Sequence, residues 1–306
     1  MRTAAVVMAL LAGLLAQPAR AEFHVFACEP EWAALVRAWL PEADITTATH
    51  YLQDPHYIEA RPSLIAKLRR ADLAVCTGAS LEAGWLPTLL QRAANPAIQV
   101  GRPGLFLAAE QVELRDAHRP VDRSMGDVHP EGNPHVHLAP DRLPRIAEAL
   151  MERLRQLRPD LSSQLFVRYL RWRGAWNQQR EVWRQAAERL RGHSVVVQHG
   201  SFRYLLDWLG VEAVLDLEPK PGLPPSAAHL QQLLAAPELG PADAILVASH
   251  QDPRPAQWLS EQTGKPVRVL PGTVTDDAAT DTLAELISTI VAALLDPSGE
   301  GAVDQP

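Results

Sequence analysis

Short apolar runs alternate with amphipathic segments in the first third of the chain. Strands are predicted at 23–28, near 44–47 and at 71–76, and helices at about 31–40, from 61–63 onward and from 82–87 onward. In the second of these helices Leu64, Leu68 and Ala71 fall on one face, which is the spacing of an amphipathic helix. Strands and helices that alternate in this way indicate an α/β unit with a parallel or mixed sheet.

The alternation stops between residues 101 and 134. This stretch is rich in Gly, Pro and His, and it carries no clear strand or helix pattern. Loops of this length are uncommon in compact domains, and those that occur are usually functional or mobile. We therefore expect a mobile loop at about 101–134 in the first lobe.

Residues 140–190 are predicted to be largely helical, with a break near 158–160. Trp172, Trp176 and Trp183 lie in the second part among many Arg and Gln residues, and we expect them to serve packing. A long helix in mid-chain, with no strand pattern beside it, is typical of a connector between two lobes. The expected division is a first lobe at 22–158, a connecting helix at 159–192 and a second lobe at 193–296.

The rhythm of strands and helices returns after residue 193. Strands are predicted at 194–197, 211–215, 244–247 and 267–270, and helices at 202–209, 227–235, 255–262 and 281–295. The predicted fold class is therefore α/β, with two lobes of mainly parallel sheet joined by one long backbone helix. Ligands of such sheets bind at the carboxyl ends of the strands, so we expect the site in the cleft between the lobes.

The first 21 residues are predicted to be a signal peptide. Arg2 gives a basic start, the apolar run at 4–16 is too short to span a bilayer comfortably, and Ala19-Arg20-Ala21 fits a cleavage site before Glu22. No Cys follows that site directly, so a lipid anchor is not expected. These features indicate a secreted protein, periplasmic in a Gram-negative host, with a polar tail at 297–306.

Composition and cysteine usage narrow the class of protein further. Of 306 residues, 47% are hydrophobic and 21% are charged, and the formal net charge is −7. A chain with this charge balance lacks the basic surface that binds nucleic acid, so no such partner is expected.

Cys28 and Cys76 each end a predicted strand. In an oxidising compartment they either form a disulfide or remain buried thiols, and the sequence leaves both possibilities open.

Three histidines lie in separate local patterns that place side chains at a cleft. His56 and His135 follow prolines, and His199 closely follows the Val-rich strand at 194–197; binding residues concentrate in such turns and strand ends. Neutral imidazole is the commonest protein ligand of zinc and similar metals. Three such residues on loops of both lobes predict a closed zinc site that needs one further ligand.

The expected fourth ligand is an acid just beyond the last predicted strand. Asp277 is the first choice and Asp276 the second, although both also fit a polar entry to the final helix, where acids are common. His250 follows another strand and is a further candidate. Asp54 is expected to orient its neighbouring histidine or to cap the loop, and Glu59 to contact a ligand from behind.

The other histidines near these motifs have different expected roles. Only His135 of the pair His135 and His137 is expected to bind metal, because the Asn-Pro turn fixes it. His129 and His118 lie on the predicted mobile loop, where they either collect metal transiently or remain solvated.

The sequence has no His-Glu-x-x-His, Gly-x-Ser-x-Gly or P-loop motif. A secreted zinc-dependent hydrolase using the same histidines, and a metal-independent structural role, are the alternatives to a binding protein.

Several of these motifs resemble the zinc/manganese solute-binding proteins of ABC importers, the family known as cluster A-I. They are Gln53-Asp54-Pro55-His56 with Arg61-Pro62-Ser63, Asn133-Pro134-His135, His199 with Phe202 and Tyr204-Leu205, and Glu218-Pro219 with Pro225-Ser226. The resemblance covers essentially the whole mature chain, in the order of the family. The segments 71–87 and 126–135 look like those of a bacterial subgroup assigned to zinc.

The resemblance implies two α/β lobes joined by a long rigid helix, with metal held by His56, His135, His199 and a carboxylate of the second lobe. It also implies docking onto a membrane permease and receipt of zinc from a periplasmic metallochaperone, and we expect a monomer. One departure concerns the carboxylate. Many members carry Leu-Asp-Pro at the end of the last strand, where this chain has Leu270-Pro271-Gly272, so the acid has to come from further on.

Zinc is expected over manganese because of the ligand types. Three imidazoles and one carboxylate suit a tetrahedral zinc, whereas the resemblance implies a second carboxylate where His199 stands in manganese sites. The predicted function is an extracytoplasmic, high-affinity receptor that delivers Zn2+ to an ABC-type importer, with manganese as the alternative cargo. No enzymatic activity is expected.

Overall fold

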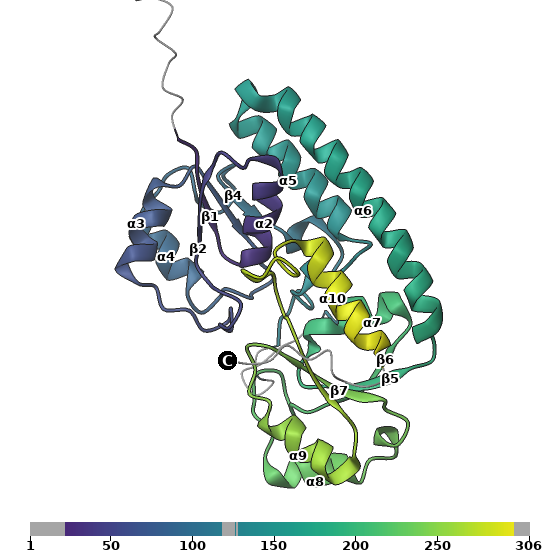
Figure 1. Cartoon of the computed structure of the whole chain (residues 1–306). Coiled ribbons are helices and arrows are strands. Elements are labelled where there is room, and N and C mark those ends of the chain that lie inside the picture. The colour runs from purple at the N-terminus through teal and green to yellow at the C-terminus, as the bar shows by residue number, and fades with distance from the viewer. Residues whose placement is uncertain (1–21, 118–125, 127, 297–306) are drawn as a thin grey trace, which may run out of the picture.

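The computed structural model describes residues 22–117, 126 and 128–296 of the chain. The predicted signal peptide, the tail at 297–306 and His118 lie outside the described residues. Within these residues the chain forms two α/β lobes, and one long helix runs beside both of them (Figure 1). No helix in the described part is long and apolar enough to cross a membrane.

The first lobe is built on four parallel strands in the order β2-β1-β3-β4. The strands are β1 (His24–Ala27), β2 (Asp44–Thr47), β3 (Leu73–Cys76) and β4 (Leu105–Leu107), and the helices are α2 (Pro30–Trp39), α3 (Pro62–Arg70), α4 (Leu86–Ala93) and α5 (Leu143–Leu157). All four helices carry a proline in their first turn, where the missing N–H has no intrahelical partner to lose.

Both faces of the first sheet are buried, as parallel sheets require. Successive residues of a strand point to opposite faces. Phe26, Ala74 and Cys76 therefore pack with α3 and α4, and Val25, Leu73 and Val75 pack with α2 and α5. The continuous apolar runs that predicted these strands reflect this double burial.

One strand lies in the stretch that was predicted to be a loop. β4 pairs with β3 in parallel register, with Ala74 opposite Leu105, so the prediction of an unstructured 101–134 segment is wrong for this part. Three residues are too few to show a period of two. The preceding Gly104 is required by close packing, because a Cβ atom there would lie 2.4 Å from the carbonyl oxygen of Ala97.

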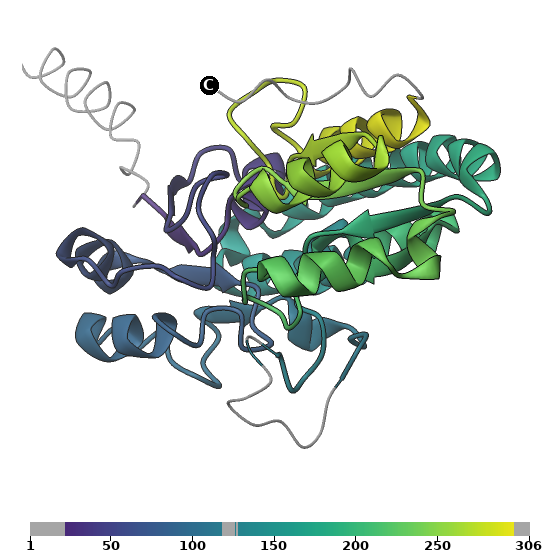
Figure 2. The ribbon, with the colours of Figure 1, turned by 90° about the horizontal axis from the view of Figure 1, so that it is seen from below.

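The second lobe repeats the topology of the first, with strand order β6-β5-β7-β8 and all strands parallel. Its strands are β5 (Ser194–Val197), β6 (Glu212–Asp216), β7 (Ala244–Ala248) and β8 (Val267–Leu270), and its helices are α7 (Arg203–Leu209), α8 (Ala227–Leu234), α9 (Arg254–Thr263) and α10 (Leu283–Leu295). Figure 2 shows helices on both sides of the strands. The fold class predicted from the sequence is confirmed.

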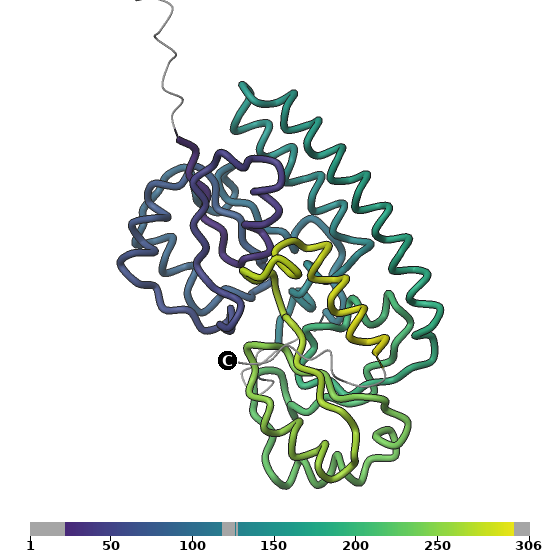
Figure 3. Tube along the Cα trace, in the orientation of Figure 1, coloured from purple at the N-terminus to yellow at the C-terminus, as the bar shows by residue number. Residues whose placement is uncertain are grey.

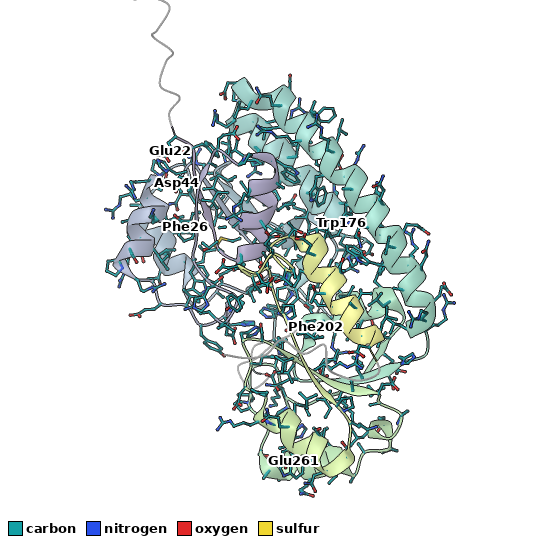
Figure 4. The ribbon with its side chains drawn as sticks, in the orientation of Figure 1. Glu22, Phe26, Asp44, Trp176, Phe202 and Glu261 are labelled. Atoms are coloured by element: carbon teal, nitrogen blue, oxygen red, sulfur yellow. A yellow bond between two sulfur atoms is a disulfide. The ribbon has the colours of Figure 1, made fainter. Side chains whose placement is uncertain are left out.

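The long helix α6 (Ser162–Leu190) follows a 3-10 turn at Pro159–Leu161, so the predicted break near residue 159 is confirmed. Figure 4 labels Trp176 on this helix. Trp176 and Trp183 are both buried, and their ring centroids lie 5.2 Å apart in an edge-to-face arrangement. The indole of Trp176 donates a hydrogen bond to the carbonyl of Pro140, and that of Trp183 to Ser288 on α10. These side chains serve packing, as predicted.

The lobes are also joined away from α6. After β8 the chain runs to the first lobe before α10 turns back along α6 (Figure 3). In that segment the hydroxyl of Thr273 donates to the buried carboxylate of Glu31 on α2. One continuous hydrophobic core includes residues of both lobes and of α6. A shared core of this kind resists wide hinge bending between the lobes.

Cys28 and Cys76 form a disulfide, with their Cα atoms 4.7 Å apart. Cys28 directly follows β1 and Cys76 ends β3, and these strands are neighbours in the sheet. Of the two possibilities left open by the sequence, the structure therefore has the disulfide.

Candidate metal centre

The same three-residue turn positions two of the predicted ligands. In Asp54-Pro55-His56, the carboxylate of Asp54 accepts the backbone N–H of His56 at 3.0 Å and lies 2.7 Å from its ring Nδ1. In Asn133-Pro134-His135, the Oδ1 atom of Asn133 accepts the N–H of His135 at 3.0 Å and lies 2.9 Å from its Nδ1. An acidic or amide residue two positions before a histidine thus fixes both its backbone and its ring.

His199 is oriented by a residue from a different strand end. It follows β5, and its Nδ1 atom lies 2.8 Å from Oε2 of Glu218, which comes two residues after the neighbouring strand β6. The same carboxylate oxygen accepts the N–H of Gly222 at 2.8 Å. Carboxyl ends of adjacent parallel strands meet at one edge of the sheet, so this contact follows from the topology.

In all three histidines an acceptor therefore occupies Nδ1. When Nδ1 carries the proton, Nε2 presents a lone pair, which is the form of imidazole that binds metal. The ring centroid of His199 lies 6.2 Å from that of His56 and 5.5 Å from that of His135. The structure thus brings together the three histidines that the sequence singled out.

The three rings are grouped more loosely than the ligands of a tetrahedral zinc. In the described residues no three histidine nitrogens lie within 4.8 Å of one another. Adjacent ligands of a tetrahedral zinc with Zn–N bonds of about 2.0–2.1 Å are about 3.3–3.4 Å apart. Binding of zinc would therefore draw the rings inward by a small movement of the turns that carry them.

Asn133 connects the predicted ligands of the two lobes. Its amide Nδ2 donates to the carbonyl of Gly200, the residue after His199, at 2.9 Å. Its own carbonyl accepts the hydroxyl of Tyr204 at 2.8 Å, and the guanidinium of Arg142 lies 4.6 Å from the centre of that tyrosine ring. The side chain that orients His135 is therefore bonded directly to the backbone beside His199.

Burial and neighbouring charges shift the pKa values of His135, His199 and Asp54 in different directions. Burial is the main cause that lowers the pKa of His135 well below its ordinary value, and the neighbouring histidines add to it. Burial also opposes the charged form of His199, but the hydrogen bond and charge of Glu218 outweigh it, so the pKa of His199 is raised. Burial would raise the pKa of Asp54, but the bond from His56 lowers it to about 2.

The predicted acidic ligands lie in an exposed segment after β8. Asp276 and Asp277 are exposed, and the carboxylate of Asp277 accepts the N–H of Ala279 at 2.8 Å. Among the contacts of the described residues, none joins Asp277 to a histidine of the site. Glu59, expected behind a ligand, is also exposed. The expected role of Asp54 as the partner of His56 is confirmed.

Three other histidines lie nearby. His137 is buried, with Nε2 2.9 Å from the carbonyl of Gly272 and Nδ1 3.3 Å from the carboxylate of Glu31, so both of its nitrogens face other partners. His250 is partly buried after β7, and burial lowers its pKa to about 4. His129 has its Nε2 atom 3.1 Å from Nε2 of His56.

A cavity of about 320 Å³ opens beside the histidines of the site. His129, His135 and His199 line it, together with the acids Asp216 and Glu218. A second group of potential ligands, Cys28, Cys76 and Glu82, lies elsewhere, but the disulfide removes the thiolates that a metal would need.

Sequence reasoning missed the contact of Glu218 with His199 and the bridging role of Asn133. Both had a signal in the sequence. Asn133 stands in the same Asx-Pro-His pattern as Asp54, and Glu218 follows a strand that neighbours β5 once the strand order is known. Strand order is a long-range property, so the second contact follows only from the fold.

Comparison with known proteins identifies the family of the chain. A family model described as ZnuA, zinc-uptake complex component A, periplasmic, matches residues 25–296. The high-affinity zinc uptake system protein ZnuA of Yersinia pestis is 25% identical over 226 residues, which is 70% of this chain and 70% of that protein.

Solved structures share the fold. A crystal structure of ZnuA superposes with a TM-score of 0.74 at 18% identity, covering 89% of this chain and 98% of the other. The periplasmic zinc-binding protein TroA from Treponema pallidum gives 0.73 at 17% identity, covering 92% and 100%. Since the family model spans nearly all of the described chain, the protein belongs to the family of zinc-uptake complex component A, the periplasmic zinc-binding receptors of ABC-type importers.

Proposed function

We propose that this chain holds one Zn2+ as transported cargo between its lobes, with Nε2 of His56, His135 and His199 as ligands. The observation that carries this assignment is the shared geometry of the three rings, because each has an acceptor at Nδ1. Outer partners of this kind fix the tautomer and the orientation of zinc-binding histidines.

The ligand and charge pattern favours zinc over manganese. Imidazole suits zinc, whereas manganese prefers carboxylate and water. The carboxylates that contact the proposed ligands, Asp54 and Glu218, are both engaged with Nδ1 atoms, so they offset the charge of the metal from behind the ligands. The family assignment confirms the predicted receptor function with zinc as cargo, and none of the relatives reported above is a hydrolase.

The family acts with an importer, so the partner of this chain is the permease of an ABC-type metal importer. The shared core across α6 favours release of zinc by a small displacement of one ligand turn over wide opening of the lobes. Signal cleavage after Ala21, a monomeric state and loading by a periplasmic metallochaperone stay predictions.

Competition between metals tests the proposal. The chain from Glu22 onward would be freed of metal and titrated with Zn2+ in the presence of excess Mn2+, with a chromophoric chelator as the competitor. We expect one zinc per chain, bound tightly and unaffected by manganese. Binding of manganese in preference to zinc, or of no metal, would contradict the proposal.

A further inference from the structure

The Nε2 atoms of His129 and His56 lie 3.1 Å apart, with the ring centroids 5.2 Å apart and the planes tilted by 33°. When the Nδ1 atom of His56, engaged by Asp54, carries the proton, its Nε2 presents a lone pair toward Nε2 of His129. The separation is close to the distance of about 3.3–3.4 Å between adjacent nitrogens of a tetrahedral zinc site. The pair is thus spaced as two ligands of one ion are.

Two further histidines of the site border the same cavity as His129. His129 lines the cavity together with His135 and His199. The three histidines of the proposed site leave one tetrahedral position to be filled. The acid expected there, Asp277, is exposed and bonded to its own loop.

The chain holds His129 in a defined turn. Its carbonyl accepts the N–H of Gly132 at 3.1 Å, and Gly132 has a φ of +125° with a hypothetical Cβ 2.4 Å from the carbonyl of Arg115, so a side chain there would force the turn apart. The carboxylate of Glu131 accepts the hydroxyl of Ser80 at 2.9 and 3.0 Å. Ser80 follows β3, and the turn is therefore anchored to the first lobe.

We propose that His129 is the fourth protein ligand of the zinc cargo, in place of a carboxylate. This inference rests on the proposed function of the other three histidines. Three ligands, His56, His129 and His135, then come from the first lobe and only His199 from the second. All four donors are imidazole nitrogens, which disfavours manganese more strongly than a set with a carboxylate.

Zinc X-ray absorption of the unaltered protein tests the ligand count directly. The account predicts four imidazoles around one zinc. Three imidazoles with an oxygen ligand would overturn the role of His129 and leave the three-histidine site intact. This measurement needs no variant, so a folding defect cannot obscure it.

Variants then identify the fourth imidazole. His129→Gln is expected to weaken zinc binding by about 100-fold or more, beyond the loss usual for an outer hydrogen-bond partner, and to leave three imidazoles in the absorption spectrum. His250→Gln tests the rival histidine, and His193→Gln is a control far from the site, where His193 pairs with Asp243 on the surface. Both are expected to bind zinc as the unaltered protein does.

The outcomes separate the two proposals. If His129→Gln keeps full affinity and four imidazoles while His56→Ala loses zinc, the inference about His129 fails and the proposed function stands. If His250→Gln reduces the imidazole count to three, His250 is the fourth ligand and the inference again fails. If neither His56→Ala nor His199→Ala affects zinc binding, the proposed function itself fails.

Discussion

Asn133 of the first lobe and Gly200 of the second are joined by a hydrogen bond of 2.9 Å from the amide Nδ2 to the carbonyl oxygen. The other end of the same amide accepts from His135, and Gly200 directly follows His199. One side chain therefore links the positions of two proposed ligands that lie on different lobes. Movement of one lobe against the other changes the distance between those ligands.

Asn133→Ala is expected to weaken zinc binding by about 10–100-fold, because His135 loses the acceptor at Nδ1 and the bridge to Gly200 is broken. Asn133→Asp keeps an acceptor for His135 but cannot donate to Gly200. It should therefore retain more zinc affinity than Asn133→Ala and release zinc faster than the unaltered protein. Equilibrium competition and stopped-flow release measure the two effects. Full affinity in Asn133→Ala would show that the bridge does not position the ligands.

The carboxylates behind the histidines should matter without touching the metal. Asp54→Asn and Glu218→Gln are each expected to lower zinc affinity by about 10–100-fold, because a neutral amide stabilises the metal-bound imidazole less than a carboxylate does. A matched control is Asp243→Asn, which removes a similar histidine contact, to His193, outside the site. Zinc affinity by competition should be unchanged in the control. Equal affinities in all three variants would argue against the orienting role.

The buried carboxyl groups of Glu29 and Glu82 should make the free energy of unfolding depend on pH. Burial raises the pKa of Glu82 to about 7 and, together with the charges of Glu82 and Glu31, raises that of Glu29 well above its ordinary value. The Oε1 atom of Glu29 is buried without a hydrogen-bond partner among the described residues. A proton retained by the pair would remove the repulsion of two carboxylates in one site.

The sign of the effect follows from proton linkage. Between pH 4.5 and 7 the folded state keeps a proton that the unfolded chain releases, so the free energy of unfolding falls as pH rises through this window. For Glu82 the fall is on the order of 3 kcal/mol. Glu82→Gln, which imitates the protonated form, should flatten the dependence of the unfolding free energy on pH, measured by urea unfolding at several pH values. Glu59→Gln, at an exposed position, should leave that dependence unchanged. An unchanged slope in Glu82→Gln would refute this account of the pair.

Removal of the disulfide should lower stability. Cys28 and Cys76 are fully buried and 48 residues apart in sequence, and closing a loop of that length stabilises the folded state by about 4 kcal/mol in the chain-entropy account. The double variant Cys28→Ala, Cys76→Ala is expected to lose about 2–4 kcal/mol of unfolding free energy. Urea unfolding of the oxidised protein and the variant measures this, and equal values would contradict the expectation.

Most of the fold was predictable because most strands and helices carry a recognisable pattern within their own residues. The double burial of β1, β3, β5 and β7 gives continuous apolar runs, and prolines mark the starts of α2, α3 and α5. β4 was missed because three residues show no period. In the site, Asp54 was recognised as a partner of His56 because the two are neighbours in sequence.

The remaining features depend on long-range placement. The contact of Glu218 with His199 needs the strand order, and the approach of His129 to His56 spans 73 residues. Asp277 was expected at the site because acids after the last strand face the cleft in proteins that the chain resembles. Here that segment runs on to α2, where Thr273 bonds Glu31, and it leaves Asp277 exposed.

Zinc titration of the mature chain beside His199→Ala tests the central claim most directly. His199 is the proposed ligand from the second lobe, so its loss separates a site between the lobes from one within the first lobe. The account predicts one tightly bound zinc per chain in the unaltered protein, and loss or severe weakening of binding in the variant with its fold retained. Equal zinc binding by the two proteins would contradict a site that joins His56, His135 and His199.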